Sequence, residues 1–137
     1  MANAKAKTSF SDLKVLLVED QLEARALTRN MLTELGVTQI FEASNGREGL
    51  TFLDNAFDFI NIVICDWNMP AMSGVEVLRQ LRTVSPDLPF LMITGLGDLD
   101  SVVEAKASGV TALIRKPFSL PQLEAKLRII MQRQAAA

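Results

Sequence analysis

The sequence predicts an α/β fold, a doubly wound parallel sheet of five strands with helices on both faces. Short apolar runs alternate with amphipathic stretches five times between residues 14 and 131, so that each expected strand is followed by an expected helix. Most of these strands are apolar on both faces, which is typical of a parallel sheet covered on both sides. Because β–α–β crossovers are right-handed, few topologies remain, and the strand order 2-1-3-4-5 is favoured.

The expected strands are short runs rich in valine, isoleucine, leucine and phenylalanine. They are Lys14–Val18, Gln39–Ala43, Phe59–Cys65, Phe90–Ile93 and Val110–Ile114. The first strand runs directly into Glu19 and Asp20, and the second runs into the turn Ser44-Asn45-Gly46. Each strand is thus expected to end in polar residues or in a turn.

The expected helices have apolar residues three and four positions apart. They are Leu22–Leu35, Arg47–Asp54, Gly74–Val84, Asp98–Ser108 and a last helix that begins at Ser119. Inward-facing residues are expected at Leu27, Met31, Leu32 and Leu35 in the first helix, at Leu50 and Leu53 in the second, and at Leu120, Leu123, Leu127 and Ile130 in the last. The start of the last helix also fits a capping box, with Ser119 as the cap and Gln122 three positions later.

Length and composition indicate one globular domain, which we place at residues 13–134 after a flexible segment rich in Ala, Lys and Ser at residues 1–12. Of the 137 residues, 49% are apolar and 22% are charged, and the net charge of −2 does not favour a nucleic-acid partner. The longest apolar runs are far shorter than the ~20 residues that span a bilayer. The N-terminus also lacks the apolar core of a signal peptide. We therefore expect a cytoplasmic protein with no membrane insertion.

Two residue counts exclude common catalytic sites. The chain has no histidine, which excludes Ser-His and Cys-His nucleophile pairs and any phosphohistidine of its own. Its single cysteine, Cys65, lies in an apolar run, where it cannot form an internal disulfide and lacks partners for zinc. Any chemistry must therefore come from other side chains.

Polar residues follow four of the five expected strands at the point where each strand ends. Taken singly, each has an ordinary explanation, such as a turn, a helix cap or a solvated charge. In a sheet of the predicted order, however, the carboxyl ends of the strands meet at one edge, with a crevice between the first and third strands. The residues that this topology brings together are Glu19, Asp20, Asp66, Thr94 and Lys116.

This group predicts a site for Mg²⁺ and a phosphoryl group. Two carboxylates about 4 Å apart repel each other by about 4 kcal/mol at an effective dielectric near 20. A hard divalent cation relieves that repulsion, and oxygen ligands of this kind suit Mg²⁺. An aspartate held beside a metal ion, a lysine and a hydroxyl is a suitable acceptor for a phosphoryl group.

The stretch Asp66-Trp67-Asn68-Met69-Pro70, followed by Gly74, completes a resemblance to a known family. With the five positions above, the chain resembles the receiver domain of bacterial response regulators from about Lys14 to Met131, and this stretch is similar to that of the single-domain chemotaxis regulators. The resemblance implies a flavodoxin-like, three-layer sandwich. It also implies a signalling domain that accepts a phosphoryl group, not an enzyme that acts on a separate substrate.

The resemblance also implies a role for each site residue. Asp66 is the expected phosphoacceptor. The expected residues of the Mg²⁺ site are Glu19, Asp20, Asp66 and the backbone carbonyl of Asn68, with Asp20 as a direct ligand and Glu19 acting through a water molecule. The expected phosphoryl-binding and switch residues are Thr94, Gly95 and Lys116, and the Lys116–Pro117 peptide bond is expected to be cis.

Two positions depart from the family's pattern. Leu113 stands where the family often has an aromatic residue that couples the site to the surface, and the chain has no tyrosine. Gly95 stands where alanine is common, and it is followed by Leu96 and Gly97. We therefore expect loop rearrangement, rather than rotation of an aromatic ring, to transmit phosphorylation to the surface.

The implied function is that of a stand-alone response regulator. A sensor histidine kinase or a histidine phosphotransfer protein would phosphorylate Asp66, and a downstream protein would dock on the face formed by the fourth helix, fifth strand and fifth helix. No output domain is expected, because the residues after Phe118 suffice for one helix only. A receiver domain cut from a longer regulator remains an alternative.

Two other functions fit less well. An aspartyl-phosphate phosphohydrolase would have a second acid two residues after the nucleophile, where this chain has Asn68. A flavin-binding carrier of the same topology would need a phosphate-binding loop after the first strand, where Glu19-Asp20-Gln21 would repel a phosphate.

Overall fold

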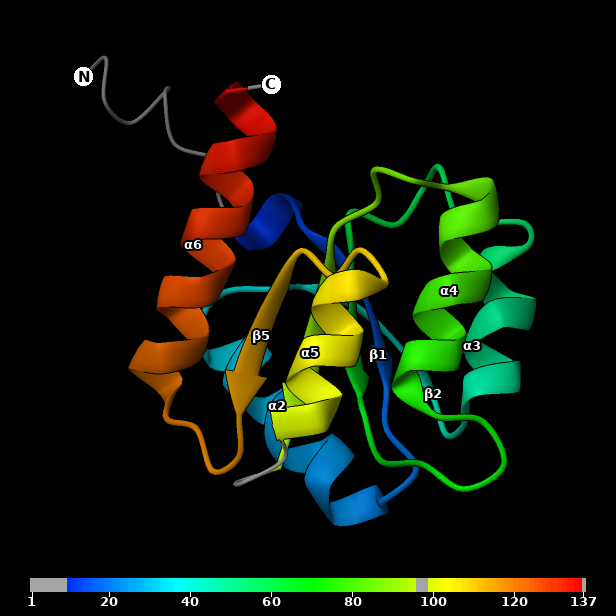
Figure 1. Cartoon of the computed structure of the whole chain (residues 1–137). Helices are drawn as coiled ribbons and strands as arrows, with labels where there is room; N and C mark the ends of the chain where they lie inside the picture. Colours follow the sequence, from blue (N-terminus) through cyan, green and yellow to red (C-terminus); the bar gives the residue numbers. More distant parts are fainter. Residues whose placement is uncertain (1–9, 96–98, 137) are drawn as a thin grey trace.

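Five parallel strands form the central sheet of the computed structural model, which describes residues 10–95 and 99–136 (Figure 1). The strands are β1 (Lys14–Val18), β2 (Gln39–Ala43), β3 (Ile62–Asp66), β4 (Phe90–Thr94) and β5 (Ala112–Arg115). Their order in the sheet is β2-β1-β3-β4-β5. This order confirms the predicted doubly wound topology.

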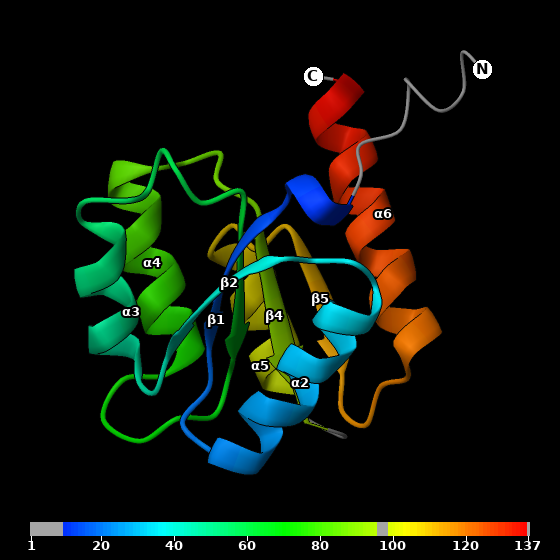
Figure 2. The ribbon, with the colours of Figure 1, turned by 180° about the vertical axis from the view of Figure 1, so that it is seen from behind.

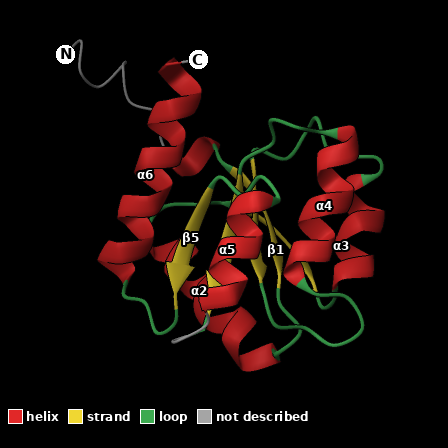
Figure 3. Cartoon of the chain, in the orientation of Figure 1, coloured by secondary structure: helices red, strands yellow, loops and turns green. Residues whose placement is uncertain are grey.

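Helices cover both faces of the sheet, which makes a three-layer sandwich (Figures 2 and 3). They are the 3-10 helix η1 (Phe10–Asp12) and the α-helices α2 (Leu22–Glu34), α3 (Gly46–Leu53), α4 (Gly74–Val84), α5 (Leu99–Ala107) and α6 (Leu120–Ala136). Helices α3, α4 and α5 pack on one face, whereas α2 and α6 pack on the other. The capping box of α6 is present, since Ser119 and Gln122 each accept a hydrogen bond from the other's backbone N–H.

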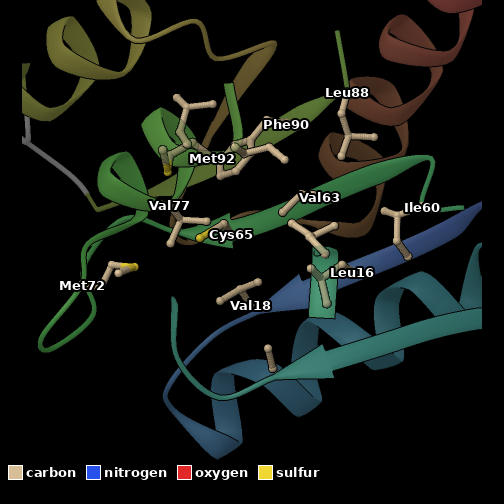
Figure 4. Packing of buried hydrophobic residues seen from close by; sticks show 14 of the residues in the cluster. Leu16, Val18, Ile60, Val63, Cys65, Met72, Val77, Leu88, Phe90 and Met92 are labelled. Carbon is tan, nitrogen blue, oxygen red and sulfur yellow. The ribbon is translucent and has the colours of Figure 1, made fainter. Parts of the chain in front are cut away.

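The two faces of the sheet supply two apolar cores because successive side chains of a strand point in opposite directions. On the face of α3 and α4, Leu16, Val18 and Cys65 lie in one cluster (Figure 4). On the opposite face, Val15 and Leu17 pack with residues of α2 and α6. Among the described residues, no helix is both long enough and apolar enough to span a bilayer.

Two strands begin later than predicted. Strand β3 starts at Ile62 because residues 56–60 still form a turn, in which the carbonyl of Ala56 accepts from the N–H groups of Phe59 and Ile60. Phe59 is consequently 43% exposed. Strand β5 starts at Ala112 because the N–H of Val110 still donates to Ala105 at the end of α5.

Leu27 was expected to face inward but is 59% exposed. Helix α2 contacts the sheet through Thr28 and Leu32, both buried, and Leu27 lies on the outer side of that contact. The apolar spacing predicted the correct helix, but the predicted buried face wrongly included Leu27. Leu120, at the first turn of α6, is likewise only partly buried.

Residues 10–12 were expected to belong to a flexible N-terminal segment but form the helix η1. Phe10 is buried against the α2 and α6 face of the sheet, and the guanidinium of Arg128 lies 4.6 Å from the centre of its ring. Burial of an aromatic ring stabilises this short helix although its sequence is otherwise polar. The rest of the expected flexible segment, residues 1–9, lies outside the described residues.

Candidate functional site

The carboxyl ends of β1, β3, β4 and β5 meet at one edge of the sheet, the lower edge in Figure 1. Glu19 and Asp20 follow β1, Asp66 ends β3, and Thr94 ends β4. One carboxylate oxygen from each of Glu19, Asp20 and Asp66 lies within 4.8 Å of the others. The parallel topology thus gathers three carboxylates that are far apart in the sequence.

Lys116 approaches this group from the end of β5. Its Nζ atom lies 3.1 Å from Oδ1 of Asp66 and 3.5 Å from Oε1 of Glu19. The site therefore combines three carboxylates with one ammonium group.

Backbone hydrogen bonds hold the ends of the strands in register beyond the regular ladders. The N–H of Glu19 donates to Ala43 at 3.1 Å, and that of Lys116 donates to Thr94 at 2.7 Å. The N–H of Trp67 donates to Ile93 at 2.8 Å. These bonds fix the main chain at the site, so that the side chains start from defined positions.

The acidic side chains lie in an unfavourable electrostatic environment. Burial raises the pKa of Asp66 above its ordinary value, although Lys116 opposes that increase. Burial and the charge of Asp66 raise the pKa of Glu19. Burial alone would lower the pKa of Lys116, but Asp66 and Glu19 outweigh it and the pKa is raised. A simple ion pair would lower the pKa of its carboxyl, so for Asp66 burial outweighs the pairing with Lys116.

Two polar atoms of the site have no partner in the described part of the chain. They are Oδ1 of Asp20 and Oγ1 of Thr94, and both are buried. Such atoms are uncommon because an unsatisfied buried acceptor or hydroxyl costs free energy. A carboxylate oxygen left without a donor beside two further carboxylates fits a hard divalent cation such as Mg²⁺. A free hydroxyl at the same edge can donate to a phosphoryl oxygen.

The loop after Asp66 turns sharply to reach α4. Asn68 is exposed, and its backbone N–H donates to the carboxylate of Asp66, which partly opposes the rise that burial causes in the pKa of that group. The N–H of Gly74 donates to Trp67 at 2.8 Å. A side chain at Gly74 would meet the backbone oxygen of Asp66 and, at 2.8 Å, Sδ of Met92. Only glycine therefore allows α4 to start this close to the acidic group.

The remaining predicted site residues are Pro117, Leu113 and Gly95. The Lys116–Pro117 peptide bond is cis. Leu113 is partly buried and pairs with Met92 in the sheet. Gly95 is exposed, whereas Leu96 and Gly97 lie outside the described residues.

Comparison with known proteins identifies the family. The family model "Response regulator receiver domain" matches residues 15–128. The chain belongs to the response regulator receiver domain family.

Curated relatives of this receiver domain include chemotaxis proteins. It is 36% identical over 124 residues to the chemotaxis protein CheY of Pseudomonas aeruginosa, a match that covers 88% of the chain and 98% of the relative. It is 35% identical over 121 residues to the chemotaxis protein CheY1 of Helicobacter pylori, which covers 87% and 97% of the two chains.

Solved structures confirm the receiver fold. A response regulator receiver domain protein from Clostridium thermocellum superposes with a TM-score of 0.84 at 28% identity, over 89% of this chain and 96% of that one. The chemotaxis protein CheY4 of Vibrio cholerae has a TM-score of 0.78 at 32% identity, over 86% and 98% of the two chains.

Sequence reasoning missed one residue that contacts the acidic pair of the receiver domain. Arg25, on the first turns of α2, donates to the backbone carbonyl of Glu19 at 2.8 Å. In the sequence it resembles any charged residue of an amphipathic helix, and no pattern distinguishes it from its neighbour Arg29. Only the fold shows that its guanidinium points toward the loop after β1.

Proposed function

We propose that this receiver domain accepts a phosphoryl group on Asp66 in a reaction that depends on Mg²⁺. The observation that carries the proposal is the position of Asp66, which is 5% exposed, borders Glu19 and Asp20, and pairs with Lys116. Burial of a carboxylate among two others costs free energy, which favours a functional role for Asp66.

The phosphoryl donor is proposed to be a phosphohistidine of a sensor histidine kinase or of a histidine phosphotransfer protein. The chain has no histidine, so this donor must come from another molecule. An ionised oxygen of Asp66 attacks phosphorus, and the new O–P bond forms as the P–N bond of the donor breaks. The bonding electrons return to the imidazole nitrogen, which takes a proton from solvent.

The residues of the site can supply the rest of the chemistry. Glu19, Asp20, Asp66 and the backbone carbonyl of Asn68 would hold Mg²⁺, which when bound supplies positive charge to the phosphoryl oxygens. Lys116 already lies 3.1 Å from Asp66 and can neutralise a further oxygen. Because these groups belong to the receiver domain itself, we also propose that it catalyses its own phosphorylation from a small acyl phosphate.

Acetyl phosphate and mass spectrometry test the acceptor. Wild-type protein with Mg²⁺ is expected to gain one phosphoryl group, and the gain should vanish in Asp66→Asn or when EDTA removes the metal. Asp58→Asn makes the same chemical change at an exposed position outside the site and should label like wild type. Undiminished labelling of Asp66→Asn would refute the assignment.

We further propose that phosphorylation controls the docking of a partner protein on α5, β5 and α6. A groove of about 770 Å³ runs along β5 between these helices, and its lining includes Thr94 and Lys116. The groove therefore shares two residues with the acidic site. Next to it, Leu99 and Val103 on α5 are 66% and 68% exposed. Exposed apolar residues beside a groove favour a partner surface.

Amide hydrogen exchange with and without beryllofluoride, a phosphoryl mimic, tests this face. Peptides from α5 and β5 are expected to change their exchange in wild type and to remain unchanged in Asp66→Asn. Since Leu113 has no ring to rotate, the segment that follows Thr94 is the proposed route of the change. Changes restricted to α2, with α5 and β5 unaltered, would contradict this output face.

We also propose that the protein acts as a stand-alone regulator in the cytoplasm. The chemotaxis relatives from Pseudomonas aeruginosa and Helicobacter pylori are matched over 98% and 97% of their own lengths, which favours a regulator of receiver-domain size. Size-exclusion chromatography and immunoblotting of the protein from its native cells would test this size, and a band much larger than 15.1 kDa would contradict it.

A further inference from the structure

Arg25 connects three elements next to the acidic edge. From α2, its Nη1 atom donates to the backbone carbonyl of Glu19 at 2.8 Å, and its Nε atom donates to Oε1 of Glu42 on β2 at 3.1 Å. Its side chain is only 16% exposed. Arg29, one turn later, donates to the other oxygen of Glu42 at 2.6 Å and is 47% exposed. Both arginines thus bind Glu42, whereas Arg25 alone of this pair also holds the loop after β1.

The backbone of Glu19 is held from both sides. Its N–H donates to Ala43 on β2, and its carbonyl accepts from Arg25. The peptide group between Glu19 and Asp20 includes this carbonyl. A displacement of the main chain at this peptide would therefore move the carboxylates of both residues relative to Asp66.

We propose that Arg25 is a positioning residue of the magnesium site. It fixes the peptide between Glu19 and Asp20, so that both carboxylates point toward Asp66 against their mutual repulsion. Glu42 orients the guanidinium through Oε1, an oxygen that Arg29 does not bind. The inference rests on the proposed magnesium-dependent function, because it assigns a role at that same site.

Arginine suits this role better than lysine does. Its planar guanidinium presents several donors in a fixed arrangement, so one side chain can bind a carbonyl and a carboxylate at once. A lysine would keep the positive charge, but its single ammonium group on a flexible chain would not hold both acceptors in place. A comparison of Arg25→Lys with wild type therefore separates an effect of position from an effect of charge.

The test is the dissociation constant for Mg²⁺, measured by the fluorescence of Trp67, the only tryptophan, which adjoins Asp66. In Arg25→Gln the dissociation constant is expected to rise about 10-fold, the loss that is common when a group orienting a metal ligand is removed. Arg29→Gln is the matched control. It removes a hydrogen bond to the same Glu42 but none to Glu19, and its dissociation constant is expected to stay within about 2-fold of wild type. Thermal melting without Mg²⁺ measures stability separately.

Arg25→Lys keeps the positive charge. It should fold even if Arg25→Gln fails to fold, so it provides a second test. We expect it to bind Mg²⁺ nearly as weakly as Arg25→Gln. Wild-type affinity in Arg25→Lys, or an equal loss in Arg25→Gln and Arg29→Gln, would overturn the positioning role while leaving the magnesium site intact. If wild-type protein shows no response to Mg²⁺, by fluorescence or by melting, the proposed magnesium site is refuted, and the role of Arg25 with it.

Discussion

Lys116 is shared between two carboxylates, and this sharing determines what it can do. Its ammonium group lies 3.1 Å from Asp66 and 3.5 Å from Glu19. One positive charge cannot neutralise three carboxylates, so the site retains negative charge that a cation can compensate. Its side chain is 39% exposed, which leaves room for it to follow a phosphoryl oxygen. Lys116 is therefore better placed to respond to the proposed phosphorylation of Asp66 than to hold the fold together.

We predict that Lys116→Ala folds but does not respond to phosphorylation. The substitution leaves the buried neighbours Ile93 and Ile114 in place, so the loss in unfolding free energy should stay below the ~2–5 kcal/mol of a core truncation. Urea unfolding measures that loss, and amide exchange with beryllofluoride measures the response. Arg47→Ala, at an exposed position on α3, should respond like wild type. A loss as large as that of a core truncation would make Lys116 a structural residue instead.

At the scale of helices and strands, the sequence predicted the type and order of every α-helix and strand because their apolar patterns are strong. The ends were less predictable. The apolar residues Phe59 and Ile60 look like part of a strand, but strand β3 begins only at Ile62. The first hydrogen bond to β1 comes from the N–H of Asn61, which donates to Lys14. The local apolar pattern of a sequence does not show which neighbours each residue meets in the folded protein. For the same reason the exposure of Leu27 and the burial of Phe10 could not be predicted.

The start of α4 gives a prediction at this scale. A methyl group at Gly74 would collide with the backbone oxygen of Asp66 and the Cα of Trp67, so Gly74→Ala must displace either the helix or Asp66, the proposed phosphoacceptor. We expect a loss of about 1–3 kcal/mol in unfolding free energy, as for other overpacked sites. We also expect slower labelling of Asp66 by acetyl phosphate.

Gly95→Ala is the matched control for stability. Apart from its chain neighbours, no atom of the described residues lies within 4 Å of a methyl group at Gly95. This variant should therefore keep its stability or gain up to about 1 kcal/mol from the reduced entropy of the unfolded chain. Equal stability of the Gly74 and Gly95 variants in urea unfolding would show that α4 can shift without cost.

For the whole molecule, the βα order alone explains why five separated polar residues meet at one edge. Once the strand order was predicted, the meeting of Glu19, Asp66 and Lys116 followed from topology. Topology did not predict the distances, the unpartnered hydroxyl of Thr94 or the contact of Arg25 with Glu19. These features depend on side-chain packing from several elements at once. The sequence thus predicts which residues form the group but not the pKa values and contacts that result.

Those pKa values predict how stability depends on pH when no metal is bound. Asp66 and Glu19 have raised pKa values in the folded protein. Between the ordinary pKa of a carboxyl and the raised value, the folded state holds more protons than the unfolded state does. The unfolding free energy therefore falls as the pH rises through that window. Asp66→Asn removes one of these titrating groups and part of the charge repulsion on Glu19. It should therefore be more stable than wild type, and its advantage in unfolding free energy should grow as the pH rises through the same window.

Urea unfolding in EDTA at several pH values measures this difference, and Asp58→Asn, exposed and outside the site, should show no such growth. Adding Mg²⁺ at neutral pH should then stabilise wild type, by about 2.7 kcal/mol at about 100 times its dissociation constant, because the ion binds only the folded site. Asp66→Asn should gain much less. If instead the advantage of Asp66→Asn shrinks as the pH rises, Lys116 lowers the pKa of Asp66 more than burial raises it, and the site needs no cation to relieve its charge.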